Sequence, residues 1–89
     1  MTYSVVLAGT TRRDLRKVPP RIAPAIIEFI YGDLSRAPTR VGKPLQRELE
    51  GVYAARRGPY RILYRIDHLT DQIKVVRIDH RAEAYRPTH

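Results

Sequence analysis

The 89-residue sequence contains no cysteine, and its longest apolar runs, such as residues 5–8, extend over only four or five residues. The lack of cysteine excludes a disulfide framework, thiolate zinc and iron–sulfur sites, and a cysteine nucleophile. The short apolar runs exclude a membrane-spanning helix. No basic segment followed by a long apolar stretch opens the chain, so no signal peptide is expected. These absences predict a cytoplasmic protein without a membrane partner.

Negative charge and lysine are also scarce. The sequence has seventeen Lys and Arg residues but only nine Asp and Glu residues, which gives a formal net charge of +8. Only Lys17, Lys43 and Lys74 are lysines, so fourteen of the seventeen are arginines. The guanidinium fork grips phosphate at two points, whereas an ammonium acts as a point charge. The expected partners are therefore polyanions: RNA, DNA or an acidic protein.

Local patterns predict one small domain over residues 1–89. Thr11, followed by Asp14 three residues later, matches a capping box that opens a brief helix. Apolar spacing predicts a longer helix over 20–35, with a start that can lie nearer Pro24. Residues 37–50 are expected to be largely irregular, with one helical turn near 45–49. Strands are expected at 3–7, 52–57, 60–66 and 73–79, and a terminal helical turn at 80–86.

Period-two alternation sorts the later strands into two faces. One face collects residues that suit a core under the long helix, namely Tyr60, Ile62, Tyr64 and Ile66. Val76 and Ile78 are likewise predicted to share one face. The opposite side carries arginines, and no acid occurs between residues 52 and 66. This side is either an ordinary solvated sheet face or an anion-binding groove in which Tyr53 or Tyr85 stacks on a base.

Side chains that can transfer protons or stabilise negative charge are concentrated at the carboxyl end, where His80, Arg81 and Tyr85 lie within six residues. Cutting RNA without a metal requires deprotonation of the 2′-hydroxyl, stabilisation of the phosphorane and protonation of the leaving 5′-oxygen. Arginine suits the second task, and the imidazole suits either proton transfer. Alternatively, both residues are structural. Strand alternation then turns His80, at the end of its strand, toward the core, and Tyr85 covers the core. The residues alone indicate nucleic-acid binding and allow a nuclease.

Several strings together resemble RelE-type toxins of the RelE/ParE superfamily. GPYRILY at residues 58–64 is similar to the family's G-x-Y-R-hydrophobic-hydrophobic-Y strand, and HRAEAY at 80–85 to its terminal H-R-x-x-x-Y signature. Residues 11–19 resemble the family's first helix, and residues 41–45 its link into the hairpin. The resemblance covers nearly the whole chain. It implies the toxin half of a bacterial type II toxin–antitoxin pair, which a small acidic antitoxin neutralises.

The resemblance also implies a mechanism: cleavage of mRNA in the ribosomal A site without a metal or cofactor. Arg61 matches the arginine that grips the phosphate. Arg81 matches the arginine assigned to transition-state stabilisation or leaving-group protonation, and Tyr85 matches the tyrosine implicated in activating the 2′-hydroxyl. His80 occupies a position that contributes in related members. The mRNA backbone is expected along the arginine-rimmed face, and the predicted RNA contacts are Arg56, Arg57, Arg65, Arg77, Lys43, Arg40 and Tyr53.

One departure concerns the strand before the turn, where the best-studied branch carries two lysines. Here the corresponding stretch, residues 53–57, carries an alanine in place of one lysine, and Arg56 stands in for the other. The ParE-like branch shares the fold but inhibits DNA gyrase and generally lacks the arginine–tyrosine pair that this tail retains. The pair favours an endoribonuclease. The alternatives are a gyrase inhibitor and a catalytically inactive basic domain that binds nucleic acid or its antitoxin.

The expected fold is α+β. It consists of a twisted, mainly antiparallel four-stranded sheet in the order β-α-α-β-β-β, with two amino-terminal helices on one face and a short carboxyl-terminal helix.

Overall fold

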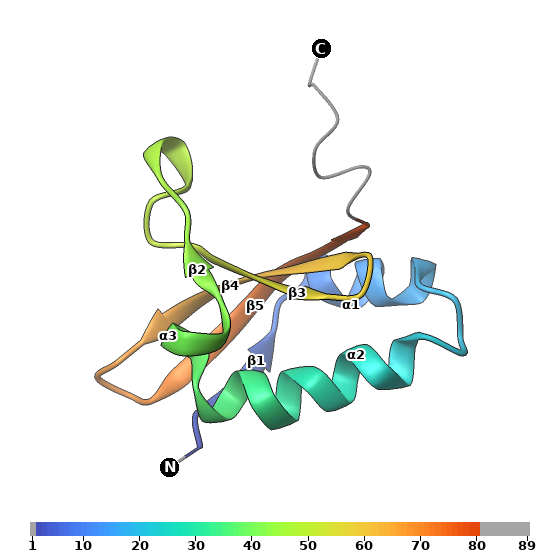
Figure 1. The fold of residues 1–89 in the computed structure, drawn as a ribbon, viewed down its shortest axis with the longest axis horizontal. Helices are drawn as coiled ribbons and strands as arrows, with labels where there is room; N and C mark the ends of the chain where they lie inside the picture. Colours follow the sequence, from blue (N-terminus) through green and yellow to red (C-terminus); the bar gives the residue numbers. More distant parts are fainter. Residues whose placement is uncertain (1, 81–89) are drawn as a thin grey trace.

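The structure is a computed structural model that describes residues 2–80. Figure 1 shows a twisted sheet with helices beside it. The elements in chain order are β1 (Ser4–Leu7), α1 (Gly9–Lys17), α2 (Ala23–Phe29), the π-helical segment η1 (Ile30–Leu34), α3 (Pro38–Val41), β2 (Lys43–Pro44), the 3₁₀ turn η2 (Arg47–Leu49), β3 (Tyr53–Arg57), β4 (Tyr60–Asp67) and β5 (Gln72–His80). None of the helices within residues 2–80 combines the length and apolar character needed to span a membrane.

The sheet has the strand order β1-β5-β4-β3-β2. β1 runs parallel to β5, and the other neighbouring pairs are antiparallel. The α+β class and the mainly antiparallel sheet are thus confirmed, with five strands in place of four. The additional strand, β2, has only two residues, and Pro44 has no N–H to donate to a ladder. Such a short strand is confined to a sheet edge and leaves no alternation in the sequence.

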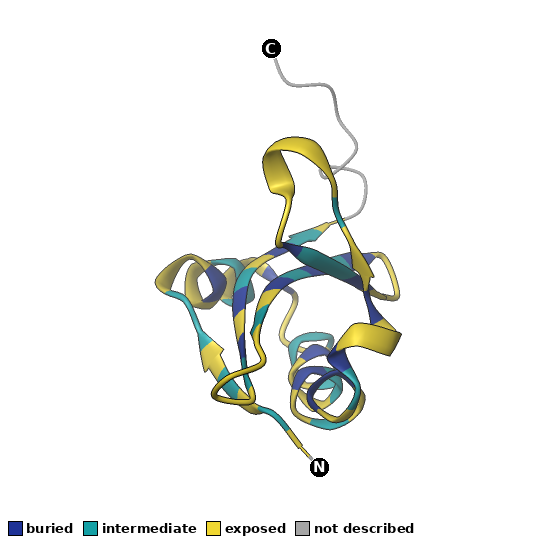
Figure 2. Cartoon of the chain, turned by 90° about the vertical axis from the view of Figure 1, so that its left-hand side faces the viewer, coloured by how far each residue is buried: buried dark blue, intermediate teal, exposed yellow. Residues whose placement is uncertain are grey.

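The core lies between the sheet and the segment formed by α2 and η1, as the buried parts of Figure 2 indicate. Tyr60, Ile62 and Tyr64 face this core as alternation predicts, while Ile66 is half-buried beside it. α2 and η1 contribute Ile26, Ile30 and Leu34, which are almost completely buried. Burial of each such side chain stabilises the fold by roughly 1.5–3 kcal/mol. Leu15 and Val18 at the end of α1 reach the same core.

The long apolar helix is divided in two. α2 begins at Ala23 with Pro24 in its first turn, where a missing N–H is tolerated, so the start near Pro24 is confirmed. The chain then continues as η1 up to Leu34. In the following connection, η2 corresponds to the expected helical turn, whereas α3 was not expected. The terminal turn expected at 80–86 lies outside the described residues, apart from His80, which ends β5.

A β-bulge overturns one expectation about β5. Leu63 pairs with Arg77, whereas the next residue, Tyr64, pairs with Val75, so Val76 is the extra residue. Val75 and Ile78 are therefore both buried, and Val76 is only half-buried. The prediction that Val76 and Ile78 share a face is wrong, because one inserted residue reverses the alternation.

The capping-box prediction for the first helix is also wrong. α1 already starts at Gly9, and its N-cap, Ala8, makes no side-chain hydrogen bond. Thr11 lies inside the helix, completely buried, and its hydroxyl donates to the Val75 carbonyl of β5 at 2.6 Å. The residues that match a local cap are thus used in contacts with a distant strand.

Tyr64 connects β4 to α3. Its buried hydroxyl donates to the Pro38 carbonyl at 2.5 Å, and burial raises the pKa of this phenol. The contact requires a glycine at position 42, because a Cβ there would overlap the Tyr64 hydroxyl and approach the Ala54 carbonyl oxygen to 3.0 Å. Gly42 thereby sets where the chain enters β2.

Replacing Gly42 with alanine is therefore expected to destabilise the fold. The added methyl group forces α3 away from Tyr64, at about 1–3 kcal/mol, which lowers the melting temperature by roughly 4–8 °C per kcal/mol in a domain of this size. Gly9→Ala is the matched control, because nothing lies within 4 Å of its added Cβ. Thermal unfolding followed by circular dichroism measures both variants. Equal melting temperatures would show that the close approach at Gly42 is unimportant.

Candidate functional site

The face of the sheet turned away from α2, called here the open face, carries the predicted arginines of β3 and β4. Arg56 and Arg61 are direct cross-strand partners. Ala54, which pairs with Lys43 of β2 and with Leu63 of β4, lies on the same face. The predicted separation of Arg61, Leu63 and Arg65 from the core residues of β4 is confirmed by this register.

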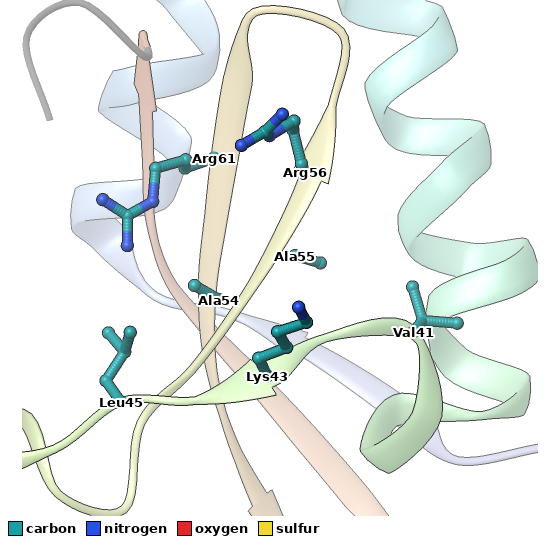
Figure 3. A pocket seen from close by; sticks show the side chains of 7 residues that line it. All are labelled: Val41, Lys43, Leu45, Ala54, Ala55, Arg56 and Arg61. Atoms are coloured by element: carbon teal, nitrogen blue, oxygen red, sulfur yellow. The ribbon is translucent and has the colours of Figure 1, made fainter.

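These residues enclose a hollow of about 440 Å³. It is lined by Val41, Lys43, Leu45, Ala54, Ala55, Arg56 and Arg61, as Figure 3 shows. Its volume falls within the range of about 300–1,000 Å³ that small-ligand sites occupy. Small apolar side chains form part of the lining, while cations extend from β2, β3 and β4. The hollow therefore suits an anionic group with an apolar or aromatic body.

The cationic row continues along the open face. Arg65 of β4 pairs with Lys74 of β5, and both side chains are exposed. Arg40, in α3, is exposed as well. Lys74 was missed in the sequence, although its place opposite Arg65 follows once the β4–β5 register is known. The row extends the positive surface beyond the hollow.

Two carboxylates compensate the charge of Arg77. Its Nε lies 3.0 Å from Asp14 Oδ2, and its terminal nitrogen Nη2 lies 2.9 Å from Asp79 Oδ1. The hydrogen bond that Arg77 donates to Asp14 and the charge of Asp79 raise the pKa of Arg77. Arg77, a predicted RNA contact, therefore has less uncompensated positive charge to offer to RNA than the sequence composition implies.

Two predicted RNA contacts lie on the other face. Tyr53 pairs with the core residue Tyr64, and the two rings stack with centroids 5.7 Å apart. Arg57 pairs with Tyr60, and together with Arg56 it lines a groove with Glu28 and Asp33 beside α2 and η1. The expectation that Arg57 rims the same face as Arg61 is wrong, because Arg57 pairs with the core residue Tyr60 whereas Arg56 pairs with Arg61.

His80 also lies on the core-facing side, as its parity predicts. It pairs with Tyr60, and the two rings meet edge to face with centroids 5.2 Å apart. The side chain is exposed in a depression that Asp14 and Lys17 help to line. The sheet thus separates His80 from Arg61. Arg81 and Tyr85 lie outside the described residues.

The chemistry available on the open face follows from these placements. The hollow is lined by no histidine, tyrosine or carboxylate from residues 2–80. Arginine stays protonated at any working pH, so it holds phosphate without exchanging protons. Among these same residues, no three histidine, aspartate or glutamate side chains gather closely enough to hold a metal ion. The described part of the site can therefore hold an anion such as phosphate through its cations.

The chain matches a known protein family and is similar to two curated toxins. Residues 5–85 match the family described as the ParE toxin of the type II toxin–antitoxin system parDE. Toxin RelG of Mycobacterium tuberculosis is 58% identical over 97% of this chain and 99% of its own length. Toxin RelE of the same organism is 43% identical over 94% of this chain and 87% of its own length.

A solved structure is similarly close. The crystal structure of the toxin–antitoxin complex RelBE2 from Mycobacterium tuberculosis contains a chain that is 57% identical to this one. The match covers 91% of this chain and 100% of that chain, with a TM-score of 0.88.

Because Arg56 and Arg57 lie on opposite faces of β3, substituting each of them is expected to affect the binding of a short single-stranded RNA differently. Arg56→Gln is expected to weaken binding about threefold to tenfold, or roughly 0.7–1.4 kcal/mol, and to reduce the slope of log K against log salt by about 0.7. Arg57→Gln removes the same charge from the other face and is expected to have an effect of less than about twofold. Fluorescence anisotropy at several salt concentrations measures both. Equal losses would mean that net charge alone governs binding.

Proposed function

The chain belongs to the ParE toxin family of type II toxin–antitoxin systems, and we propose that this toxin is a ribosome-dependent endoribonuclease that cleaves mRNA and blocks translation in the cytoplasm. The observation that carries the proposal is the cross-strand pair of Arg56 and Arg61 beside Lys43 on the open face. Three cations around one hollow fit a nucleotide backbone, and Arg81 and Tyr85 follow β5 directly in the sequence.

In this mechanism the sheet binds and the carboxyl-terminal residues react. The open face orients the mRNA backbone, and Arg61 grips the phosphate to be cleaved. Tyr85, in its deprotonated form, accepts the proton of the 2′-hydroxyl as the new bond from the 2′-oxygen to phosphorus forms. Arg61 and Arg81 neutralise the pentacoordinate phosphorane. The bond from phosphorus to the 5′-oxygen then breaks, and that oxygen takes the proton that Tyr85 accepted, which gives a 2′,3′-cyclic phosphate and a 5′-hydroxyl.

The ribosome has a physical role in the proposal. The hollow lacks a described proton-transfer group, so the reaction depends on accurate placement of the scissile phosphate. A ribosome that presents mRNA in a fixed geometry supplies this placement and lowers the demand on acid–base residues. His80 lies on the opposite side of the sheet from Arg61, which makes Tyr85 the stronger candidate for the first proton transfer.

A cognate antitoxin is the expected partner. The similar RelBE2 chain is described as part of a toxin–antitoxin complex. Because this chain carries a net charge of +8, an acidic segment that covers the open face would neutralise it and exclude RNA.

One observation favours a second candidate function. The matching family is described as ParE toxin, and the ParE-like branch of the superfamily inhibits DNA gyrase. The same basic face would then contact gyrase or its DNA. The curated relatives of this chain are named RelG and RelE, and its tail retains Arg81 and Tyr85, which favours the ribonuclease.

Primer extension on a reporter mRNA in a translating extract tests the ribonuclease. The wild-type toxin is expected to make codon-phased cuts that require ribosomes. Arg81→Ala is expected to slow cutting about 10²–10³-fold through loss of charge stabilisation, and Tyr85→Phe about 10²–10⁴-fold through loss of proton transfer. Arg57→Gln, on the other face, serves as the matched control and keeps near-normal cutting.

Intact mRNA in the presence of wild-type toxin, together with growth arrest in cells, would contradict the ribonuclease. A supercoiling assay with purified gyrase would then decide in favour of the second candidate. If the toxin does not cut mRNA, does not inhibit gyrase and does not arrest growth, the remaining candidate is a catalytically inactive domain that binds nucleic acid or its antitoxin.

A further inference from the structure

Arg61 lies between a cation and an acid on the open face. Arg56 of β3 is its cross-strand partner on one side, and Asp79 of β5 is its partner on the other. Figure 3 shows the Arg61 side chain extending from β4 to the side on which β5 runs. Directly opposed residues of neighbouring strands have Cβ atoms only about 4.5–5.5 Å apart. A phosphate that Arg61 holds would therefore lie close to the Asp79 carboxylate.

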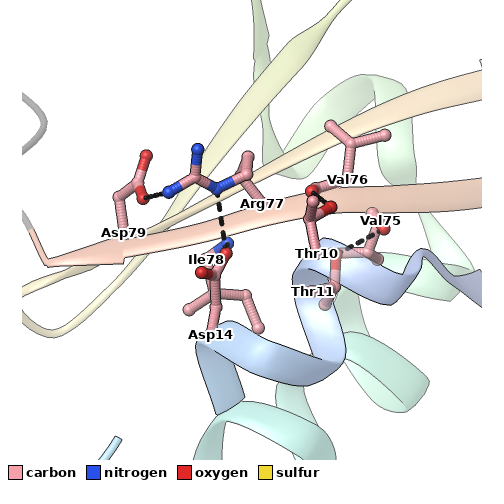
Figure 4. Close-up of polar contacts among 8 residues, drawn as sticks. All are labelled: Thr10, Thr11, Asp14, Val75, Val76, Arg77, Ile78 and Asp79. Atoms are coloured by element: carbon pink, nitrogen blue, oxygen red, sulfur yellow. Dashed lines mark hydrogen bonds and ion pairs between the residues drawn. The ribbon is translucent and has the colours of Figure 1, made fainter. Parts of the chain in front are cut away.

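A chain of polar contacts holds the Asp79 carboxylate in place, as Figure 4 shows. Arg77 donates from Nη2 to Asp79 Oδ1 at 2.9 Å and from Nε to Asp14 Oδ2 at 3.0 Å. Asp14 Oδ2 also accepts the backbone N–H of Ile78 at 2.8 Å, and the Asp14 side chain is only 11% exposed. The position of Asp79 is thus tied, through Arg77, to a largely buried carboxylate of α1.

The charges of Asp14, Arg77 and Asp79 do not balance. Two carboxylates share one guanidinium, so one negative charge stays uncompensated among these three side chains. The Asp79 side chain is 24% exposed, so it reaches the surface while protein atoms shield most of it from water. A face that is otherwise suited to polyanions therefore carries a fixed negative charge directly beside Arg61.

We propose that Asp79 makes the open face select internal phosphodiesters over terminal phosphates, on the premise of the proposed function that this face binds the RNA backbone. An internal phosphate carries one negative charge, whereas a terminal phosphate ester carries about 1.5–2 at neutral pH. Repulsion by Asp79 grows with the charge of the ligand, so it opposes a terminal phosphate more strongly. Fixed repulsion against the wrong ligand is a general source of specificity. Free nucleotides, which end in terminal phosphates, are thereby kept from occupying Arg61.

The test uses two ligands that differ by one charge. Adenosine 5′-monophosphate and its methyl ester share the base and the sugar, but at about pH 8 only the monoester is a dianion. Each ligand competes with a fluorescent single-stranded RNA for the toxin, and fluorescence anisotropy gives both affinities. At a separation of about 6 Å in water, removal of the Asp79 charge changes the affinity about threefold for each negative charge on the ligand. Asp79→Asn is therefore expected to raise the affinity about threefold for the methyl ester and about tenfold for the monoester.

Asp67→Asn is the matched control, because strand alternation places Asp67 on the same face of β4 as Arg61. The strand between them spans roughly 20 Å, which exceeds the Debye length of about 8–10 Å. Asp67→Asn is therefore expected to change either affinity by less than about 1.5-fold. Asp79→Asn keeps an oxygen that accepts the hydrogen bond from Arg77, and thermal unfolding checks that each variant is folded. If Asp79→Asn fails to fold, Asp79→Gln and Asp79→Glu differ by the same charge and supply the comparison.

Arg61→Gln, measured with the same RNA, separates the selectivity from the proposed function. Wild-type RNA affinity in this variant would overturn binding of the RNA backbone at Arg61, and with it the premise. Weaker RNA binding by Arg61→Gln, with equal gains for the two ligands in Asp79→Asn or with no gain, would overturn the role of Asp79 and leave the proposed function standing. Weaker RNA binding by Arg61→Gln, with the larger gain for the monoester in Asp79→Asn, supports both.

Discussion

The fold depends on how the outer edge of β5 satisfies its hydrogen bonds. Buried backbone N–H and carbonyl groups require partners, and β1 provides them only as far as Val75. α1 meets the remaining requirement through Thr10, Thr11 and Asp14, which reach β5 with side chains. The helix is therefore held beside the strand by polar contacts as well as by Leu15 and Val18 in the core. The end of β5 can extend past β1 without an open edge.

This constraint also explains which parts of the fold are predictable from sequence. The hairpin and the core face of β4 follow from local alternation around Tyr60, Ile62 and Tyr64. Thr11 and Asp14 match a capping box equally well, but their partners lie more than sixty residues away, so only tertiary structure reveals their use. The bulge at Val76 is hidden for a similar reason, because two adjacent valines carry no signal of which one leaves the ladder.

The candidate site was predictable in composition but not in arrangement. Arginine content indicates an anion-binding face, whereas the register across the Gly58–Pro59 turn decides which arginines belong to it. Arg57 pairs with the core residue Tyr60, so it shares the face of α2, and Arg56 shares the face of Arg61. Pairing likewise places Lys74 beside Arg65. Arg77 shows a further limit, because its compensation by Asp14 and Asp79 joins residues from two distant segments.

An open face built from arginines separates binding from chemistry. Guanidinium groups hold phosphate at fixed geometry but do not exchange protons at cellular pH. Under the proposed mechanism, the proton transfers must therefore come from residues that follow β5. Asp79 faces Arg61 across β4 and β5 and is tied through Arg77 to Asp14. The polar contacts that complete the sheet edge thus also reach the binding surface, because Asp79 is the cross-strand partner of Arg61.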